Sequence, residues 1–314
     1  MPQPPTDKEL MIAAIKAYAR YGSERSAARS LGWPPSSMHN RLEAARREGM
    51  AIPAPMAPHV KGRRLEADFT DGIILVGSDA HYWPGEPSTA HRAFVHFCKK
   101  LKPSIVVLNG DAIDCAAISR HPPIGWTHIP DVRDEIEICQ QRLGEIAKAS
   151  GKAKRYWPLG NHDARFETRL AMAAPEFKGV PFTSLIDHFP DWEPCWSVQI
   201  GGEKGIVIKH RFKSGIHAPH NNTLWAGRSI VTGHLHSLKV QPISDYNGTR
   251  YGVDCGCLAD PYGPQFQDYL EDNPRTWRSG FTVLTFKDGR LLWPELVHVI
   301  EPGLIEFRGE IISV

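Results

Sequence analysis

RYWPLGNHDARFE, residues 155–167, passes directly from apolar residues to three polar ones. Tyr156, Trp157 and Leu159 suit a buried strand, whereas Asn, His and Asp are poor strand formers and cost free energy when buried without partners. Gly160 stands between the two parts and permits a tight turn. We therefore expect a strand that ends in a turn displaying Asn161, His162 and Asp163.

The same arrangement recurs at four other places along the chain. IILVG at 73–77 leads into Ser-Asp-Ala-His, and SIVVLN at 104–109 leads into Gly-Asp-Ala-Ile-Asp. IVIK at 206–209 leads into His210, and SIVT at 229–232 leads into Gly-His-Leu-His. Continuous apolar runs of this length are typical of fully buried strands.

The segments around these runs indicate the fold class. Residues 131–150 carry Ile136, Ile138, Leu143 and Ile146 on or near one side, which predicts a helix between the second and third strands. Strands that alternate with helices predict an α/β sandwich. Towards the C-terminus, the Asn-Gly pair in SDYNGTRYGV and the Asp-Gly pair in FTVLTFKDGRLLW each predict a β-hairpin.

The first 50 residues are predicted to be helical throughout. Gly22 is expected to end the first helix and Ser23 to cap the second. Prolines at 53, 55 and 58 predict a semi-rigid linker. We therefore expect a helical module at 1–50, a linker at 51–66 and an α/β domain at 67–314. The apolar residues at helical spacing in the module are Leu10, Met11, Ala14, Ile15, Tyr18, Ala27, Ala28, Leu31, Met38, Leu42 and Ala45.

Residues 6–49 resemble a helix-turn-helix DNA-binding module, in which the last helix enters the major groove. Residues 1–50 hold eight Lys and Arg against five Asp and Glu, and KGRR at 61–64 adds three more cations, which favours DNA as a partner. The alternative is a small bundle that serves dimerisation or docking. The expected DNA contacts are Ser36, Ser37, His39, Asn40 and Arg41.

The composition is that of an ordinary globular protein, with 41% hydrophobic and 23% charged residues. No apolar run approaches the roughly 18 residues that span a bilayer, so no membrane partner is expected. The N-terminus lacks the apolar core of a signal peptide. Six scattered cysteines indicate free thiols and predict a cytoplasmic location. Cys255 and Cys257 are expected to be small strand residues rather than a metal-binding or redox pair.

The polar residues after the five apolar runs form a single set of candidate metal ligands. The carboxyl ends of neighbouring strands converge at one rim of an α/β sheet. Carboxylates, imidazoles and one amide oxygen suit manganese, iron or zinc, and they are too many for one tetrahedral ion. Asp111 could bridge two ions about 3.5–4 Å apart. The set comprises Asp79, His81, Asp111, Asp114, Asn161, His162, Asp163, His210, His234 and His236.

DAH, GDAID, GNHD, a lone histidine and GHLH, in this order over residues 72–260, resemble the motif set of the calcineurin-like metallophosphoesterases. The resemblance implies two mixed β-sheets packed face to face with helices outside. It also implies two divalent cations, manganese first, with iron, zinc, nickel and magnesium as alternatives. One ion would take Asp79, His81, Asp111 and His236, and the other would take Asp111, Asn161, His210 and His234. His162 would donate a proton and be oriented by Asp163, with Asp114 behind the ligands.

One stretch departs from that motif set. The family often follows its lone histidine with glycine, whereas this chain reads KHRFKSG after residue 208. His210 directly follows an apolar strand and is the preferred ligand. His217 or His220 could replace it or contact phosphate.

The resemblance implies phosphate-ester hydrolysis by a metal-bridging hydroxide, with His162 as general acid. The helical module favours a DNA-directed phosphodiesterase or nuclease similar to the DNA-repair exonuclease branch. The alternative is a protein or small-molecule phosphatase or phosphodiesterase whose bundle only forms a homo-oligomer or docks. A non-catalytic DNA-binding regulator is the third hypothesis, and the intact ligand set argues against it.

Overall fold

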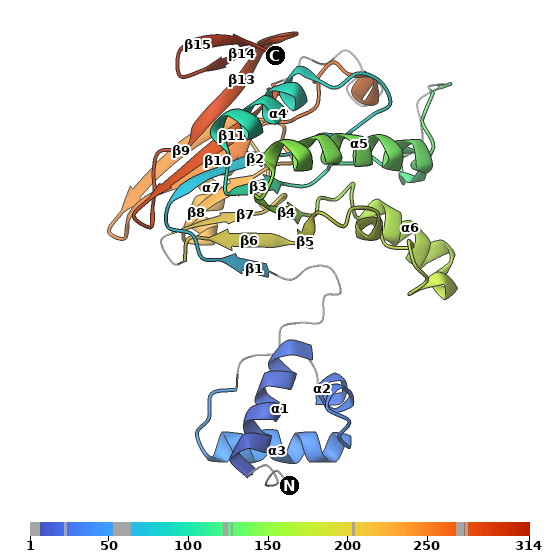
Figure 1. Ribbon diagram of the computed structural model, residues 1–314, viewed down its shortest axis with the longest axis vertical. Coiled ribbons are helices and arrows are strands. Elements are labelled where there is room, and N and C mark those ends of the chain that lie inside the picture. Colours follow the sequence, from blue (N-terminus) through green and yellow to red (C-terminus); the bar gives the residue numbers. More distant parts are fainter. Residues whose placement is uncertain are drawn as a thin grey trace. The chain divides into compact units, whose positions relative to one another are not determined.

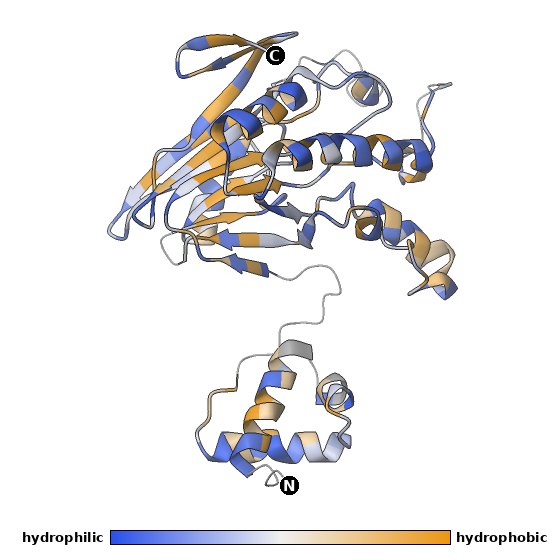
Figure 2. Cartoon of the chain, in the orientation of Figure 1, coloured by the Kyte–Doolittle hydropathy of each residue, from blue (hydrophilic) through white to orange (hydrophobic). Residues whose placement is uncertain are grey.

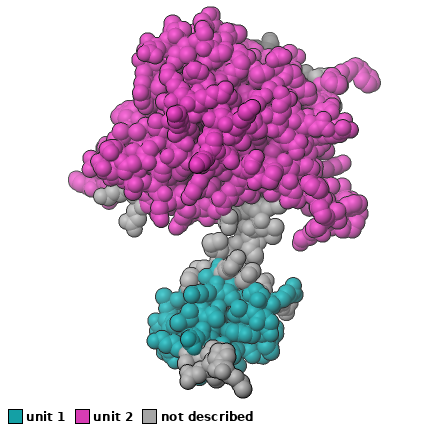
Figure 3. Space-filling model, in the orientation of Figure 1, with its two compact units in different colours: residues 1–63 teal, residues 64–314 magenta. Residues whose placement is uncertain are grey.

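A computed structural model describes residues 7–21, 24–52, 64–121, 125–126, 128–202, 205–267, 273 and 276–314. The chain divides into two compact units, residues 1–63 and 64–314, which Figure 3 shows in separate colours. Most of the expected linker, including Lys61 to Arg63, lies outside the described residues, as do Gly22 and Ser23.

Three helices form the described core of the smaller unit: α1 (Asp7–Tyr21), α2 (Glu24–Ser30) and α3 (Pro35–Arg47). Pro34 and Pro35 precede and open α3, where the proline ring favours the first helical turn and no backbone N–H is lost. The apolar stripes expected from the spacing meet in one cluster. Its buried members are Ala14, Ala17, Ala27, Ala28, Met38 and Leu42.

Two mixed β-sheets form the larger unit. The smaller sheet has the order β1 (Arg64–Ala67), β6 (Ser197–Ile200), β7 (Ile206–Ile208), β8 (Ser229–Thr232), β10 (Gly248–Cys255) and β9 (Leu238–Asp245). The larger sheet has the order β15 (Glu310–Ser313), β14 (Leu304–Phe307), β13 (Glu295–Glu301), β11 (Gly280–Lys287), β2 (Gly72–Gly77), β3 (Ile105–Leu108), β4 (Lys154–Pro158) and β5 (Glu193–Cys195), with β12 (Arg290–Leu291) beside β11.

The two sheets pack face to face because alternate residues of each strand point to opposite sides. Ile74 and Val76 of β2 join Val231 of β8 in the cluster between the sheets, whereas Leu75 faces away, towards the helices. On that outer side, α4 (Thr89–Leu101) packs against β2, β11, β13 and β14, and α5 (Val132–Ser150) packs against α4. On the other side, α7 (Ala218–Ala226) packs against β8, β9 and β10. The predicted sandwich with outer helices is thus confirmed (Figures 1 and 2).

The hairpins differ in how well they were predicted. The Asp288–Gly289 turn between β11 and β12 has φ angles of 51° and 70°, as expected for Asp-Gly. The hairpin of β9 and β10 instead turns at Tyr246–Asn247, because Gly248 already pairs with Asp245. The other helices among the described residues are α6 (Arg165–Ala173), η1 (Ala116–Ile118), η2 (Pro175–Phe177), η3 (Leu185–His188) and η4 (Pro264–Phe266).

Two further sequence expectations concern cysteines and membrane spans. All six cysteines are free and buried, including Cys255 and Cys257, which lie at the end of β10 and just beyond it. Among the described residues, no helix combines the length and apolar character needed to cross a bilayer.

Candidate metal centre

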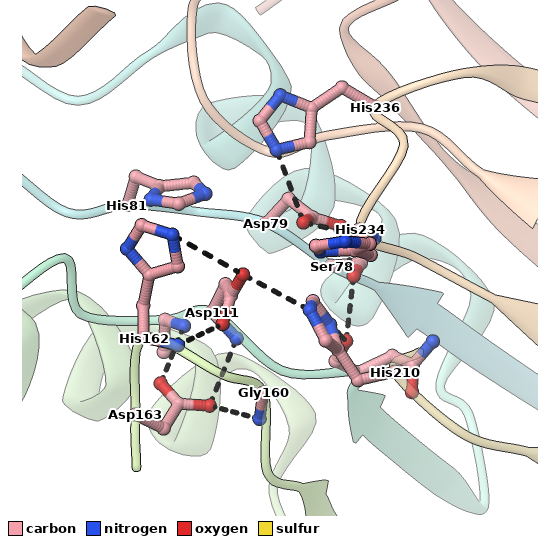
Figure 4. Close-up of polar contacts among 12 residues, drawn as sticks. Ser78, Asp79, His81, Asp111, Gly160, His162, Asp163, His210, His234 and His236 are labelled. Carbon is pink, nitrogen blue, oxygen red and sulfur yellow. Dashed lines mark hydrogen bonds and ion pairs between the residues drawn. The ribbon is translucent and has the colours of Figure 1, made fainter. Parts of the chain in front are cut away.

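The polar residues that follow five strands lie close together, as Figure 4 shows for those that it labels. Strands β2, β3 and β4 of the larger sheet lead into the Asp79, Asp111 and Asn161 turns. Strands β7 and β8 of the smaller sheet lead into His210 and the His234 turn. The candidate ligands therefore come from both sheets, not from the rim of one sheet.

Five candidate ligands share an uncommon backbone conformation. The φ angles are 51° at Asp79, 40° at His81, 49° at Asp111, 69° at His234 and 53° at His236. Few residues other than glycine adopt positive φ, and such residues concentrate at functional sites because the surrounding structure must hold them there. Main-chain bonds do so here: the Asp79 amide donates to Gly110 O at 2.9 Å, and the His81 amide donates to Asp111 O at 3.0 Å.

Asp79, His81 and His236 form the first group of potential ligands, with one donor atom of each lying within 4.8 Å of the others. Nε2 of His236 lies 3.2 Å from Asp79 Oδ1. The Asp79 carboxylate also accepts the His234 amide at 2.9 and 3.0 Å and the Ser78 hydroxyl. Burial raises the pKa of Asp79, but the neighbouring histidines His236 and His210 outweigh it and leave this pKa lowered.

Asp111, His210 and His234 form the second group, again with one donor atom of each within 4.8 Å of the others. His210 donates from Nδ1 to Asn109 O at 2.7 Å, which turns Nε2 towards Asp111 Oδ2 at 3.0 Å. A backbone bond at one ring nitrogen fixes the orientation of a ligand histidine. Burial lowers the pKa of His210, but Asp111 and Asp79 raise it to about 10. A bound cation would take the place of this proton.

Unpartnered polar atoms test whether these residues fit a metal. His81 Nε2 and Asn161 Oδ1 are buried and have no hydrogen-bond partner. A buried polar atom left unsatisfied costs about 1–3 kcal/mol, so such atoms are rare without a ligand. Imidazole, carboxylate and amide donors also suit the divalent transition metals expected from the sequence. The residues therefore fit two divalent cations.

Asp114 lies behind this centre and contacts two histidines. Its Oδ1 is 3.0 Å from His81 Nδ1 and 2.5 Å from His162 Nδ1. These contacts leave Nε2 of His162 facing the centre, 4.0 Å from Asp111 Oδ2. Burial lowers the pKa of His162, but the bond to Asp114 and the charge of Asp111 outweigh it and raise this pKa.

Asp163 does not orient His162, contrary to the sequence prediction. Its carboxylate accepts the backbone amides of Asp111 and Ala112, both at 2.9 Å, and of Gly160 at 2.7 Å. It also accepts the Trp157 indole N–H at 3.0 Å. Burial raises the pKa of Asp163 to about 6. Asp163 thus ties the turn after β3 to the turn after β4, and Asp114 takes the position beside His162.

Arg165 is a site residue that the sequence reasoning missed. Its Nη2 lies 3.2 Å from Nε2 of His162, and its Nη1 donates to Asp114 O at 2.9 Å. It opens α6, three residues after His162, which brings its side chain back beside the turn. A cation three positions beyond the histidine of GNHD was the available signal.

Two aromatic residues from a distant part of the chain were also missed. Phe266 packs against His81 and His236, with ring centroids 5.1 and 5.5 Å apart. Trp277 lies 4.1 Å from the ring of His236, centroid to centroid, and 4.9 Å from Phe266. Both follow β10 in sequence, so no local pattern connects them with the ligands.

Gly160 is expected to be essential for the shape of the centre. A Cβ at this position would lie 2.1 Å from Asp111 Oδ1 and 2.5 Å from its backbone nitrogen. Gly160→Ala should therefore displace Asp111 and weaken Mn²⁺ binding about 10- to 100-fold, the range for changes that disturb a ligand's support. Isothermal titration with Mn²⁺ measures this. Gly144→Ala on α5 is the matched control, because a Cβ there meets nothing within 4 Å, and its Mn²⁺ affinity should be unchanged.

His217 and His220 were the alternative ligands to His210. Both are exposed, whereas His210 is buried and grouped with Asp111 and His234. The geometry therefore favours His210 as the ligand.

The expected DNA-contacting residues lie on the first two turns of α3. Ser36, His39 and Asn40 are exposed, and Ser37 and Arg41 are half-buried. Arg41 stacks on Trp33, 4.3 Å from the ring centroid, and donates to the Ser37 carbonyl at 3.2 Å. His39 Nδ1 lies 3.1 Å from Glu24. Of the five residues, Ser36 and Asn40 therefore have the side chains most accessible to a DNA ligand.

Comparison with known proteins gives structural similarity only. No protein-family model matches the chain, and no curated protein matches its sequence. The chain is similar to Vps29 complexed with Zn²⁺ from Entamoeba histolytica, with 15% identity, 77% of this chain and 98% of that chain covered, and a TM-score of 0.40. It is similar to a conserved uncharacterised protein, named a predicted phosphoesterase, from Streptococcus pneumoniae TIGR4 (14%, 78% and 99%, TM-score 0.34). It is also similar to a dimetal phosphatase from Danio rerio (10%, 78% and 99%, TM-score 0.37).

Proposed function

We propose that this chain is a divalent-metal-dependent phosphoesterase of the calcineurin-like superfamily that hydrolyses phosphodiester bonds in DNA. The observation that carries the proposal is the pairing of two His and Asp groups, one with Asp79 and one with Asp111, in which every residue except the half-buried His234 is buried. His81 Nε2 and Asn161 Oδ1, on residues of the same turns, are buried and have no hydrogen-bond partner. Two adjacent cation sites are the arrangement used for in-line displacement at phosphorus.

The proposed ligand sets follow the two groups. Bound divalent cations would supply positive charge for the phosphoryl oxygens and lower the pKa of water towards neutrality. Asp111 is in contact with both groups, since its carboxylate lies 3.0 Å from His210 Nε2 and its carbonyl oxygen accepts the His81 amide at 3.0 Å. One ion would be held by Asp79, His81, Asp111 and His236, and the other by Asp111, Asn161, His210 and His234.

His162 is the proposed general acid. Its Nδ1 is engaged by Asp114, so Nε2, the nitrogen that faces the centre, would be the one to give a proton to the leaving oxygen. Its side chain keeps about 20% of its surface exposed, which permits contact with a substrate. Arg165, 3.2 Å from that nitrogen, is placed to bind a phosphoryl oxygen through its guanidinium.

DNA is the proposed substrate because of the smaller unit. Its three helices and the exposed Ser36 and Asn40 on α3 are compatible with major-groove contact. The competing proposal is a phosphatase or small-molecule phosphodiesterase in which this unit only oligomerises. An accessory unit does not define chemistry, so the substrate must be tested directly.

The decisive experiment is an activity panel with added Mn²⁺. Its substrates are single- and double-stranded DNA, RNA, bis-p-nitrophenyl phosphate and the p-nitrophenyl monoester. We expect hydrolysis of DNA and of the diester, loss of both with chelator, and recovery with Mn²⁺. Hydrolysis of the monoester alone would support the phosphatase. No hydrolysis of any phosphate ester would overturn the proposed function.

Removal of residues 1–63 is expected to weaken binding to duplex DNA and to flatten its salt dependence. Each DNA phosphate that the protein no longer neutralises lowers the slope of log K against log salt by about 0.9 units. A chain that starts at Arg64 keeps the whole larger unit, so it should hydrolyse bis-p-nitrophenyl phosphate as fast as the full chain. Gel-shift titrations at two salt concentrations measure the first effect. Unchanged DNA affinity with an altered oligomeric state in light scattering would favour the competing proposal.

Two single-residue variants test which helix of the smaller unit contributes to duplex DNA binding. Asn40→Ala removes an exposed amide from α3 without changing the net charge, whereas Lys16→Ala removes a charge from α1. If α3 contacts bases, Asn40→Ala should weaken duplex binding more than Lys16→Ala does, by about 1–3 kcal/mol for one bidentate pairing with a base edge. The reverse order would indicate non-specific attraction of the whole unit.

A further inference from the structure

The segment from Arg211 to Trp225, which directly follows the candidate ligand His210, has an unusual charge. Residues 204–244 contain none of the chain's 35 Asp and Glu, yet they hold six of its 37 Lys and Arg. Arg211 and Lys213 are exposed and lie one and three residues beyond His210. The surface beside the second metal group is therefore cationic, which attracts a polyanion.

The same segment exposes large apolar side chains. The exposed fractions are 39% for Phe212, 77% for Ile216, 49% for Leu224 and 70% for Trp225. On α7, the face that includes Asn222 and Thr223 is buried, so Leu224 and Trp225 point outwards. Burying such side chains is favourable, so an exposed patch of this kind on a segment that begins at a candidate ligand indicates a binding surface.

Within this surface, a lysine side chain packs against an exposed tryptophan ring. The Lys213 ammonium lies 4.2 Å from the centroid of the Trp225 ring. Lys213 comes from the loop after β7 and Trp225 from the end of α7, so the pair joins the two ends of the segment. An ammonium beside an exposed indole ring offers a phosphate contact and a stacking surface at once.

Buried polar contacts fix the segment to the strand that leads to His234. The Lys213 amide donates to Asn222 Oδ1 at 2.8 Å, and Asn222 Nδ2 donates to Thr232 Oγ1 at 3.2 Å. Thr232 Oγ1 in turn donates to Asp254 at 2.8 Å. Because Thr232 ends β8, two residues before His234, the surface is held in place relative to the candidate metal centre. A preorganised surface loses less conformational entropy on binding.

We propose that residues 211–225 bind an unpaired nucleic-acid strand beside the metal centre, with a base stacked on Trp225 and phosphates at Arg211 and Lys213. The inference rests on the proposed function and narrows its DNA substrate to an unpaired strand. An unpaired strand can present the face of a base to an indole ring, whereas bases inside a duplex are stacked on one another. A duplex would use only the cations.

The test is fluorescence anisotropy with a labelled oligo(dT) of about 12 nucleotides in chelator, where binding is measured without cleavage. Trp225→Ala should weaken oligo(dT) binding about 10-fold, the order expected for loss of one stacked base. An abasic deoxyribose-phosphate chain of equal length should bind the Trp225→Ala and unaltered chains equally, because it has no base to stack. Lys213→Gln should lower the slope of log K against log salt for both ligands by about 0.7 units, the value for one phosphate contact of a single strand.

Tyr246→Ala is the matched control variant. Tyr246 is a fully exposed aromatic residue in the turn after β9, an eight-residue strand that begins two residues after His236. At about 3.3 Å per residue the strand places Tyr246 roughly 25 Å from the centre. Its replacement should leave oligo(dT) affinity unchanged. Circular dichroism and Mn²⁺ titration check that all variants are folded.

Distinct outcomes separate this inference from the proposed function. Equal oligo(dT) affinity of the Trp225→Ala, Tyr246→Ala and unaltered chains would overturn the stacking surface even if bis-p-nitrophenyl phosphate is hydrolysed. If Trp225→Ala weakens oligo(dT) binding as expected but no phosphate ester is hydrolysed, the nucleic-acid-binding surface is supported and the proposed phosphoesterase activity is wrong. If no oligonucleotide binds, the surface contacts another class of partner, such as a protein, and the inference is wrong.

Discussion

Asp111→Ala should reduce phosphodiester hydrolysis to the background rate, a loss of about 10³-fold or more. A catalytic metal ion contributes several kcal/mol of charge stabilisation, and each 1.4 kcal/mol is about tenfold in rate. The Asp111 carboxylate lies 3.0 Å from His210 Nε2, and the Asp111 carbonyl oxygen accepts the His81 amide at 3.0 Å. The carboxylate also accepts the His162 amide at 2.8 Å. Its removal would therefore disturb both ion sites and the turn that carries the proposed acid.

The measurement is the rate with bis-p-nitrophenyl phosphate at saturating Mn²⁺, together with the Mn²⁺ stoichiometry. Asp134→Ala is the control, because Asp134 is an exposed aspartate in the first turn of α5. It should keep full activity and full metal content. An active Asp111→Ala chain that still binds two ions would refute the two-metal proposal.

His162→Ala should lower the turnover of DNA about 10²- to 10⁴-fold while leaving both ions bound. The His162 ring contacts Asp114 on one side and Arg165 on the other, and it belongs to neither proposed ligand set. Its loss should therefore remove proton donation to the leaving oxygen but not the charge provided by the cations. The loss should be smaller with bis-p-nitrophenyl phosphate, whose nitrophenolate leaves without protonation.

The comparison of substrates is the informative measurement for His162. His96→Ala, which changes a half-buried histidine of α4, serves as the control and should preserve both rates. The number of metal ions bound by His162→Ala shows whether His162 is a ligand or a general acid. A chain with fewer than two ions would make His162 a ligand, and equal losses with both substrates would argue against general acid catalysis.

The strands that carry the centre could be predicted from the sequence because each is a short, continuous apolar run followed by polar residues. The runs at 73–77 and 229–232 correspond to β2 and β8 almost residue for residue. The division of these strands between two sheets could not be predicted, because buried strands look alike whichever sheet they join. The resemblance to a known family supplied that part of the expectation.

The role of Asp163 shows where sequence reasoning fails within the site. In a tight turn, consecutive side chains point in different directions, and the spacing of Asn161, His162 and Asp163 does not reveal which neighbour each one meets. Asp163 faces main-chain amides 50 residues earlier in the chain, whereas Asp114 reaches His162. Phe266 was equally inaccessible, because its contact with His81 crosses 185 positions of sequence.

Because the candidate ligands come from both sheets, the geometry of the centre depends on how the two sheets pack against each other. Asp79 from one sheet contacts His236 from the other, and Asp111 contacts His210 in the same way. Elsewhere the sheets meet through apolar residues such as Val76 and Val231, whose contacts have no fixed direction. A core substitution that lets one sheet slide by a fraction of an ångström would separate the paired ligands before it unfolds the protein. A small shift between the sheets should therefore lower the affinity for Mn²⁺ even when the melting temperature does not change measurably.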